Sequence, residues 1–253
     1  MKLAEVSWVV AQAILKKVDT AILPVGSTEQ HGPHCPLGTD HLTAEAVANM
    51  VGDRVKLPVL PVIPVGVSSH HRQFSGTLWA SPSVFREYVK AIILNASSHG
   101  PKKFFIINGH GGNTPSLKEV AEDLRSDEDI FLAIATAYPT KLDGHAGEDE
   151  TSIMLYLCPE LVKMEKAVDT KQNEALASIR MKTQKVGPAD FGFDTIDLSP
   201  TGVFGAAGKT IEATKATAAH GEEIVKAHVD ELCAFAEELK KAKLEELLPK
   251  PHK

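Results

Sequence analysis

The sequence predicts an α/β fold, a three-layer αβα sandwich built around a mainly parallel sheet. Strand-like apolar runs alternate with helical stretches along the chain, which is the order that a parallel sheet with helices on both faces requires. The run from Lys103 to Asn108 is apolar without alternation, as expected of a strand that is buried on both faces.

The first half of the chain contains the first two predicted strands. The N-terminal apolar residues recur at helical spacing and are interrupted by polar ones, so this segment predicts a surface helix and not a targeting signal. Next come a strand at 20–25, a helix from about 40 to 53 with Thr39 as N-cap, and a strand-like run at 57–65.

The second half continues the alternation. Ser81 and Pro82 mark the start of a helix over 82–98. Further elements are expected as a strand at 103–108, a helix at 115–125, a strand at 130–137 and a helix at 147–157. The Gly- and Pro-rich segment 184–209 predicts a surface excursion or a lid, and 210–247 predicts a helix that Gly221 interrupts.

Length and composition predict a single domain over 1–253. Apolar residues make up 43 % of the 253 residues, which is ordinary for a globular protein. A net charge of -6 with interleaved signs excludes the basic footprint of nucleic-acid or anionic-membrane binders. No segment is long and apolar enough to span a bilayer. The three cysteines are widely separated, so we expect no disulfide and a reducing, cytoplasmic location.

The segment Gly26 to Asp40 gathers candidate metal ligands on one loop. It reads GSTEQHGPHCPLGTD and follows the strand at 20–25. Its candidate ligands are Glu29, His31, His34 and Asp40. Carboxylates and imidazoles on a Gly/Pro-shaped loop suit a divalent ion, which takes oxygen and nitrogen ligands at short distances.

Two further clusters follow other elements. The motif NGHGGN, residues 108–113, comes after a buried strand, and glycines flank His110 on both sides. The motif HAGEDETS, residues 145–152, opens a helix on which Glu150 shares the apolar face. A buried carboxylate is costly unless it is paired or binds a metal, so Glu150 is a stronger ligand candidate than Glu148 or Asp149. In an open α/β sheet such clusters meet at the carboxyl ends of the strands.

Together these motifs, with His71 to Thr77, resemble those of the creatininase family of metal-dependent amidohydrolases. Order and spacing match from about residue 5 to about residue 225. The resemblance implies a creatininase-like three-layer domain, a site for two divalent ions (zinc, manganese or iron), and hydrolysis of an unusual C–N bond. It also implies a homo-oligomer, often a hexamer.

The same resemblance implies individual roles. Glu29, His31, Asp40 and His110 match metal ligands, with Asp40 as the bridge between two ions, and His145 matches a catalytic histidine. Creatininases proper carry a glutamate two residues after the ligand histidine, where this chain has Gly112. Glu150 is our candidate replacement for that carboxylate.

The predicted reaction is two-metal hydrolysis of a small-molecule amide. Metal-activated water attacks a carbonyl of a creatinine-like cyclic amide. The amides of Gly111 and Gly112, or the side chain of Asn113, stabilise the oxyanion, and His145 or Glu148 protonates the leaving nitrogen.

Other activities stay open beside this one. They are a formylaminopyrimidine-nucleotide deformylase of archaeal flavin and deazaflavin synthesis, a mycofactocin-type peptide-processing enzyme, and an inactive metal-binding scaffold. Structural zinc sites favour closed cysteine and histidine sets, so the carboxylate-rich set argues for catalysis.

Two competing motifs do not fit their contexts. The residues Ala96 to Gly100 resemble a nucleophile elbow with Ser98, but they close a helix, whereas an elbow follows a strand. The residues Gly202 to Thr210 approach a phosphate-binding loop, yet the glycine spacing is one residue too long.

Overall fold

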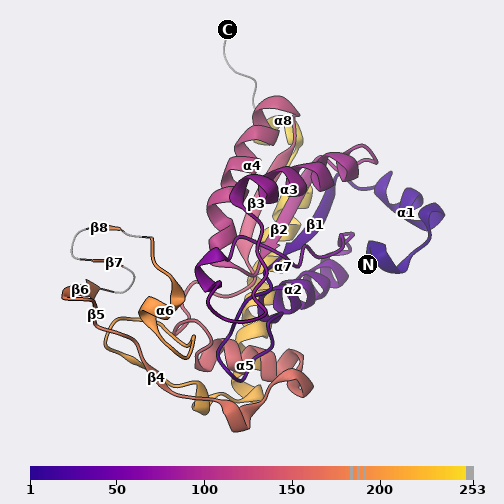
Figure 1. Cartoon of the computed structure of the whole chain (residues 1–253). Helices are drawn as coiled ribbons and strands as arrows, with labels where there is room; N and C mark the ends of the chain where they lie inside the picture. Colours follow the sequence, from indigo (N-terminus) through magenta and orange to yellow (C-terminus); the bar gives the residue numbers. More distant parts are fainter. Residues whose placement is uncertain (183–184, 187–188, 191, 249–253) are drawn as a thin grey trace.

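A parallel three-stranded sheet forms the centre of the computed structural model, which describes residues 1–182, 185–186, 189–190 and 192–248. The strands are β1 (Thr20–Val25), β2 (Lys103–Asn108) and β3 (Phe131–Thr136), in the order β1-β2-β3 (Figure 1). They are paired over their whole lengths, so that Val25, Asn108 and Thr136 lie side by side. The loops that follow the three strands therefore leave from one edge of the sheet.

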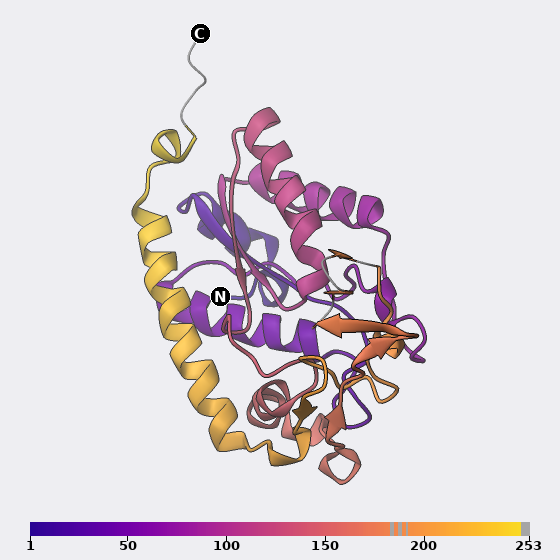
Figure 2. The same ribbon diagram turned by 90° about the vertical axis from the view of Figure 1, so that its left-hand side faces the viewer.

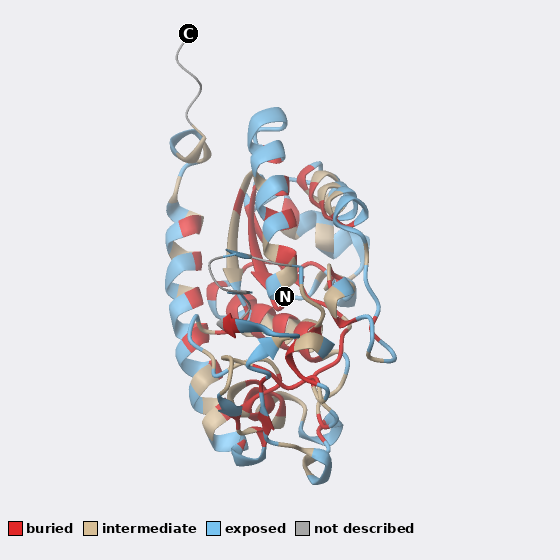
Figure 3. Ribbon diagram, turned by 60° about the vertical axis from the view of Figure 1, so that its left-hand side comes forward, coloured by how far each residue is buried: buried red, intermediate tan, exposed pale blue. Residues whose placement is uncertain are grey.

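Helices cover both faces of this sheet, which confirms the predicted three layers. The helices α2 (Thr39–Val55) and α7 (Ala218–Lys241) pack on the face that carries Phe105 and Ile107. The helices α3 (Pro82–Ser97) and α4 (Thr114–Asp127) pack on the opposite face, against Phe104 and Ile106. Adjacent strand residues point to opposite faces, so one continuous apolar run serves both cores. Figures 2 and 3 show the long α7 on the outside, with buried residues on the helix faces that meet the sheet.

The remaining elements surround this core. α5 (Glu148–Leu157) packs against α7, and α1 (Trp8–Leu15) lies at the edge of the molecule near the N-terminus. The other helices are α6 (Thr195–Leu198) and α8 (Leu244–Leu247), with 3-10 turns at Leu3–Glu5, Ser69–His71, Gly111–Asn113, Pro159–Leu161, Met164–Lys166 and Ala213–Lys215. Short strands form two small sheets: β4 (Thr170–Lys171) with β9 (Thr210–Ile211), and the series β5 (Ala175–Leu176), β6 (Ile179–Lys182), β7 (Lys185–Val186) and β8 (Ala189–Asp190).

The prediction of a continuous strand at 57–65 was wrong. The chain runs parallel to β1 there but makes only isolated bridges, from Val59 to Ile22 and from Ile63 to Val25. Pro58, Pro61 and Pro64 have no N–H to donate, which breaks the ladder.

The prediction of a helix over 210–247 placed the first residue of the helix too early. Residues 210–211 belong to β9, and α7 begins only at Ala218, where the Thr217 hydroxyl accepts a hydrogen bond from the His220 amide. Gly221 lies inside α7 and does not break it. A Cβ at Gly221 would lie 1.9 Å from the carbonyl oxygen of Ser152, so the glycine lets α7 approach α5 closely.

The other expected helices and strands agree with the structure to within a few residues. Ser81 caps α3 as predicted, because its hydroxyl accepts a hydrogen bond from the Val84 amide. Thr39, expected as an N-cap, is instead the first residue of α2, with Gly38 at the cap. Of the expected surface excursion, residues 184, 187–188 and 191 lie outside the described residues. None of the described helices is both long enough and apolar enough to cross a membrane.

Candidate metal centre and cavity

Four of the predicted metal ligands meet at the carboxyl edge of the sheet. Glu29 and His31 lie on the loop that follows β1, Asp40 is the second residue of α2, and His110 follows β2. Gly109 allows this approach, since a Cβ there would lie 2.2 Å from the carbonyl oxygen of Asp40. All four ligand candidates are buried.

Asp40 lies between two histidines. Its Oδ1 is 3.1 Å from Nε2 of His31, and its Oδ2 is 3.2 Å from Nδ1 of His110. The same His110 nitrogen is 3.1 Å from Oε2 of Glu29. A carboxylate that offers one oxygen to each side suits a position between two cations.

The donor atoms of this cluster fit divalent ions. Two groups of three residues place one donor atom each within 4.8 Å of the others: Glu29, Asp40 and His110, and Glu29, His31 and His145. Both carboxylate oxygens of Glu29, Nε2 of His31 and Oδ2 of Asp40 are buried without a hydrogen bond within the described part of the chain. Such orphaned polar atoms are costly unless something binds them, and mixed nitrogen and oxygen donors suit zinc, manganese or iron.

The cluster shifts the pKa values of its own members. Burial lowers the pKa of His31, but the charge of Asp40, 3.1 Å away, outweighs burial and raises it to about 9. Burial raises the pKa of Asp40, yet His31 and His110 outweigh this and hold it below its ordinary value. Burial raises the pKa of Glu29, and the charge of His110 offsets part of that effect.

Glu150 is buried on α5 at the border of this cluster. Its Oε2 lies 3.8 Å from Nε2 of His31 and accepts a hydrogen bond of 2.6 Å from the Ala146 amide. Ala146 has a left-handed backbone (φ +54°), and this hydrogen bond holds it there. Burial raises the pKa of Glu150 to about 7. Glu150 belongs to neither three-donor group, although it lies near His31.

His145 reaches the cluster from the turn before α5. Its ring centroid lies 4.2 Å from that of His31 and 4.9 Å from that of Phe204. Its Nε2 is 2.8 Å from the backbone oxygen of Gln30. Burial, followed by the charge of His31, lowers the pKa of His145 well below its ordinary value, so the ring is neutral at pH 7.

Of the predicted oxyanion donors, two line the cavity and one does not. Gly111 and Gly112 line the cavity, and neither amide donates a hydrogen bond within the described residues. The side chain of Asn113 is fully buried and does not line the cavity, because its amide group bonds to Gly26, Val67 and Asn108. At Gly112 a Cβ would lie 2.4 Å from Nε2 of His110, so no side chain fits there unless His110 moves.

Two other candidates lie away from the cluster. Glu148 is half-buried at the start of α5, where its amide donates to the carboxylate of Asp143, and it is not among the cavity lining residues. The ring of His34 is buried against the hydroxyl of Thr151, 2.8 Å away, and burial lowers its pKa to about 4. His34 was therefore grouped wrongly with the other three loop candidates.

A cavity of about 980 Å³ opens above the cluster. Its lining includes Glu29, His110, His145 and Glu150, together with aromatic and apolar side chains. The residues that sequence reasoning did not assign are Gln30 beside the cavity, and His70, His71, Tyr138, Leu142, Phe193 and Phe204 in its lining. The His70-His71 pair precedes the Gly76-Thr77 turn, and His71 begins one of the motifs of the family resemblance, which was a local signal for this part of the lining. The excursion expected at 184–209 contributes Phe193, Phe204 and Ala206 to this lining.

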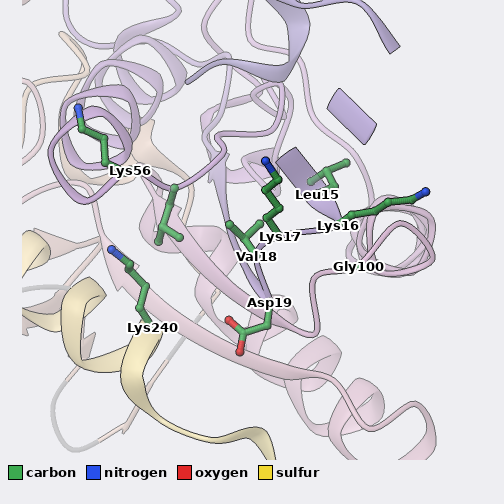
Figure 4. Close-up of a pocket in the computed structure, with 9 residues that line it drawn as sticks. Leu15, Lys16, Lys17, Val18, Asp19, Lys56, Gly100 and Lys240 are labelled. Atoms are coloured by element: carbon green, nitrogen blue, oxygen red, sulfur yellow. The ribbon is translucent and has the colours of Figure 1, made fainter. Parts of the chain in front are cut away.

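A second cavity of about 570 Å³ lies at the opposite edge of the sheet. Lys16, Lys17, Lys56 and Lys240 line it, but their ammonium groups point in different directions (Figure 4). Lys56 and Lys240 lie at the C-terminal ends of α2 and α7, and Lys240 donates to the carbonyl oxygen of Val55. Cations at helix C-termini stabilise the helices, which accounts for these charges without a ligand.

The chain resembles known proteins over most of its length. The family profile described as creatinine amidohydrolase matches residues 4–236. The mycofactocin precursor peptide peptidase of Mycobacterium tuberculosis (strain ATCC 25618 / H37Rv) is 32 % identical over 223 residues, which cover 83 % of this chain and 81 % of the relative. The creatinine amidohydrolase of Pseudomonas putida is 29 % identical over 194 residues, 65 % of this chain and 75 % of the relative.

Solved structures share the fold. A creatininase described as the manganese form has a TM-score of 0.75 at 24 % identity and covers 98 % of this chain and 99 % of its own. An E122Q creatininase of Zn-Zn type has a TM-score of 0.74 at 24 % identity, with 98 % of both chains covered.

Proposed function

This chain belongs to the creatininase family of hydrolases, and we propose that it is a two-metal amidohydrolase that cleaves a C–N bond in a peptide-like substrate. The observation that carries the proposal is the set of buried, unsatisfied donor atoms on Glu29, His31 and Asp40, beside a large cavity that Glu29 itself lines. Burial without partners is tolerated where an ion completes the site.

The residues divide naturally between two ions. Glu29, Asp40 and His110 would hold one, and His31, Asp40 and Glu150 would hold the other. The 3.8 Å separation between His31 and Glu150 supports the second set. When bound, two such ions supply a water molecule of lowered pKa and polarise the carbonyl that is attacked.

The protein's own groups would do the remaining work. Gly111 and Gly112 line the cavity with amides that make no hydrogen bond within the described residues, so these amides are our candidates to donate to the oxyanion that develops on the substrate. His145 is neutral and lines the cavity, so it can accept a proton and pass it to the departing nitrogen. Glu148 remains a weaker candidate for that transfer because it lies outside the cavity lining, and Asn113 has no amide hydrogen to spare.

The size and lining of the cavity favour a substrate larger than creatinine. Cavities of about 300 to 1,000 Å³ bind drug-sized ligands, and this one lies near the upper limit. Creatinine is a single small ring and would leave most of the aromatic wall unused. The similarity to the mycobacterial peptidase supports the same choice. Creatinine itself is the second candidate because the family profile carries that activity in its description.

The formylaminopyrimidine nucleotide fits less well. Its phosphate would need a cation, and the cavity has neither lysine nor arginine among its described lining residues. Asp143 is among the lining residues, and its carboxylate would repel the phosphate.

Activity of the metal-loaded protein tests the proposal. We would strip the protein with a chelator, reload it with zinc, manganese or iron, and measure cleavage of short apolar peptides, creatinine and the formylaminopyrimidine nucleotide. Asp40→Asn should lose both metal and activity, whereas Asp123→Asn, an exposed carboxylate on α4, should keep both. Stoichiometric metal with no cleavage of any substrate would favour the inactive-scaffold alternative.

Assembly into a homo-oligomer is part of the same proposal. Trp8, Val9 and Val10 on α1 are 75 %, 56 % and 44 % exposed, which is unusual for three consecutive apolar residues of a free surface. Light scattering on the purified protein would give the mass, and Trp8→Glu should reduce it. A monomer at micromolar concentration would contradict this part of the proposal.

A further inference from the structure

Gln30 connects four separate segments beside the cavity of the proposed active site. It lies between two metal-ligand candidates, Glu29 and His31, and is 4 % exposed. Its side-chain nitrogen Nε2 is 2.9 Å from Nδ1 of His71, 3.0 Å from Nε2 of His145 and 3.1 Å from the carbonyl oxygen of Gly202. An amide nitrogen carries two hydrogens, so it cannot donate to all three neighbours.

The orientation of the Gln30 amide is determined by a backbone group. Its Oε1 accepts a hydrogen bond of 2.9 Å from the Gly32 N–H, which can only donate. Its Nε2 therefore faces the two histidines and Gly202. The carbonyl oxygen of Gly202 can only accept, so it takes one amide hydrogen. Gly202 has a left-handed backbone (φ +82°), and a Cβ there would collide with Oε1 of Gln30.

The backbone of Gln30 determines where His145 carries its proton. Nε2 of His145 is 2.8 Å from the carbonyl oxygen of Gln30, which can only accept. Nε2 must therefore be protonated, since two lone pairs at this distance would repel. It cannot then accept from the Gln30 side chain. Its other ring nitrogen, Nδ1, makes no hydrogen bond among the described residues, so its lone pair is available there.

The second amide hydrogen of Gln30 then belongs to His71. Nδ1 of His71 must accept it, so the proton of this neutral ring is on Nε2. That nitrogen lies 3.2 Å from Oε1 of Glu29, without the geometry of a hydrogen bond, but close enough that an unprotonated nitrogen would be repelled by the carboxylate. The hydroxyl of Thr195, 3.0 Å from Nδ1, is compatible with the same arrangement.

We propose that Gln30 is a positioning residue that sets the tautomers of His71 and His145. It makes His71 present an N–H to the metal-ligand candidate Glu29, and it leaves Nδ1 as the one nitrogen through which His145 can take a proton or contact substrate. His145 consequently does not bind a metal ion through Nε2, although it lies in a three-donor group with Glu29 and His31. The catalytic consequence rests on the proposed function, whereas the tautomers do not.

Nitrogen NMR on the zinc-loaded protein tests this assignment directly. Histidine labelled with ¹⁵N reports which ring nitrogen is protonated, and His71→Asn and His145→Asn assign the signals. We expect His145 protonated on Nε2 and His71 protonated on Nε2. A proton on Nδ1 of either ring in the unaltered protein would overturn the proposal.

Two substitutions separate tautomer control from simple packing. Gln30→Glu keeps the shape but replaces the donor by an acceptor, so the His71 proton should move to Nδ1. Gln30→Met keeps the volume without polarity, so the single His71 tautomer should become a mixture. The signals of His220, which is paired with Asp149 elsewhere, should not move in either variant. Unchanged His71 signals in both folded variants would show that Gln30 only packs.

Turnover gives a second, separable result. If the peptide-like substrate is cleaved, Gln30→Glu should lower kcat by about 10- to 100-fold with metal content unchanged, because His71 in its other tautomer no longer presents an N–H to the ligand candidate Glu29. The His145 tautomer, which the backbone carbonyl of Gln30 sets, should stay the same in this variant. The value of KM should change much less. If the unaltered protein cleaves nothing, the proposed function fails while the NMR result still decides the role of Gln30.

Discussion

Metal binding at the Glu29, His31, Asp40 and His110 cluster should tighten steeply as the pH rises from 7 to 9. The perturbation is pH itself, applied to the metal-free protein. His31 has a pKa of about 9 there, mainly because Asp40 outweighs the effect of burial, so His31 carries a proton at pH 7. A histidine must be neutral to bind a metal ion, and the ion must displace that proton.

The size of the effect follows from this pKa. Between pH 9 and pH 7 the proton on His31 becomes about 2.7 kcal/mol harder to remove, since each pH unit corresponds to about 1.36 kcal/mol. The apparent affinity should therefore fall about 100-fold over this range for one proton. The pKa of His110 is also raised, because Glu29 and Asp40 outweigh burial, so a second proton would steepen the dependence.

The free energy of unfolding of the metal-free protein should fall as the pH rises, whereas its metal affinity should increase. His31 has a folded-state pKa above its ordinary value of 6.5. The contribution of His31 to the free energy of unfolding is fully present below pH 6.5 and is lost as the pH rises through about 9. The loss is at most about 3 kcal/mol. Urea unfolding of metal-free protein at pH 6.5, 8 and 9.5 would measure this loss.

Calorimetry in two buffers of different protonation enthalpy counts the protons released. We expect at least one proton to be released on metal binding at pH 7.5, and about one proton fewer in His31→Gln. The exposed His99→Gln should behave like the unaltered protein. An apparent zinc affinity that is constant between pH 7 and 9 would refute the electrostatic reasoning about the cluster.

Three further predictions concern individual side chains. Glu150→Gln should lower the metal content from about two ions per chain to about one while the fold is kept, measured by elemental analysis and circular dichroism; two tightly bound ions would remove Glu150 from the ligand set. Gly221→Ala should destabilise the protein by about 1–3 kcal/mol in urea unfolding, since the new Cβ would overlap the carbonyl of Ser152, whereas Gly111→Ala, with no heavy atom within 4 Å of a Cβ, should be nearly neutral for stability. Lys103→Met should cost about 2–4 kcal/mol because Nζ of this fully buried lysine bonds to the carbonyl oxygens of Leu239 and Ala242 at the end of α7, and the neighbouring exposed Lys102→Met should cost little.

Local sequence patterns were sufficient to predict many of the helices, strands and candidate ligands of this protein. The apolar run at 103–108 predicted β2, and Ser81-Pro82 predicted the start of α3, because burial pattern and capping act within a few residues. The expectation that Glu29, His31, Asp40 and His110 converge also came from the sequence, since parallel strands bring the loops that follow them to one edge. The family resemblance rested on the same short motifs.

Tertiary contacts decided the rest. His31 and His34 differ little in sequence context, yet only His31 faces Asp40, because α5 brings Thr151 against His34 from 117 positions away. The side chain of Asn113 is occupied by hydrogen bonds with the backbones of Gly26 and Val67. The backbone oxygen of Gln30 lies 2.8 Å from Nε2 of His145, a residue 115 positions away in the sequence. Hydrogen-bond direction depends on which atoms meet in space, so the proton positions at this site follow from the fold and not from any local pattern.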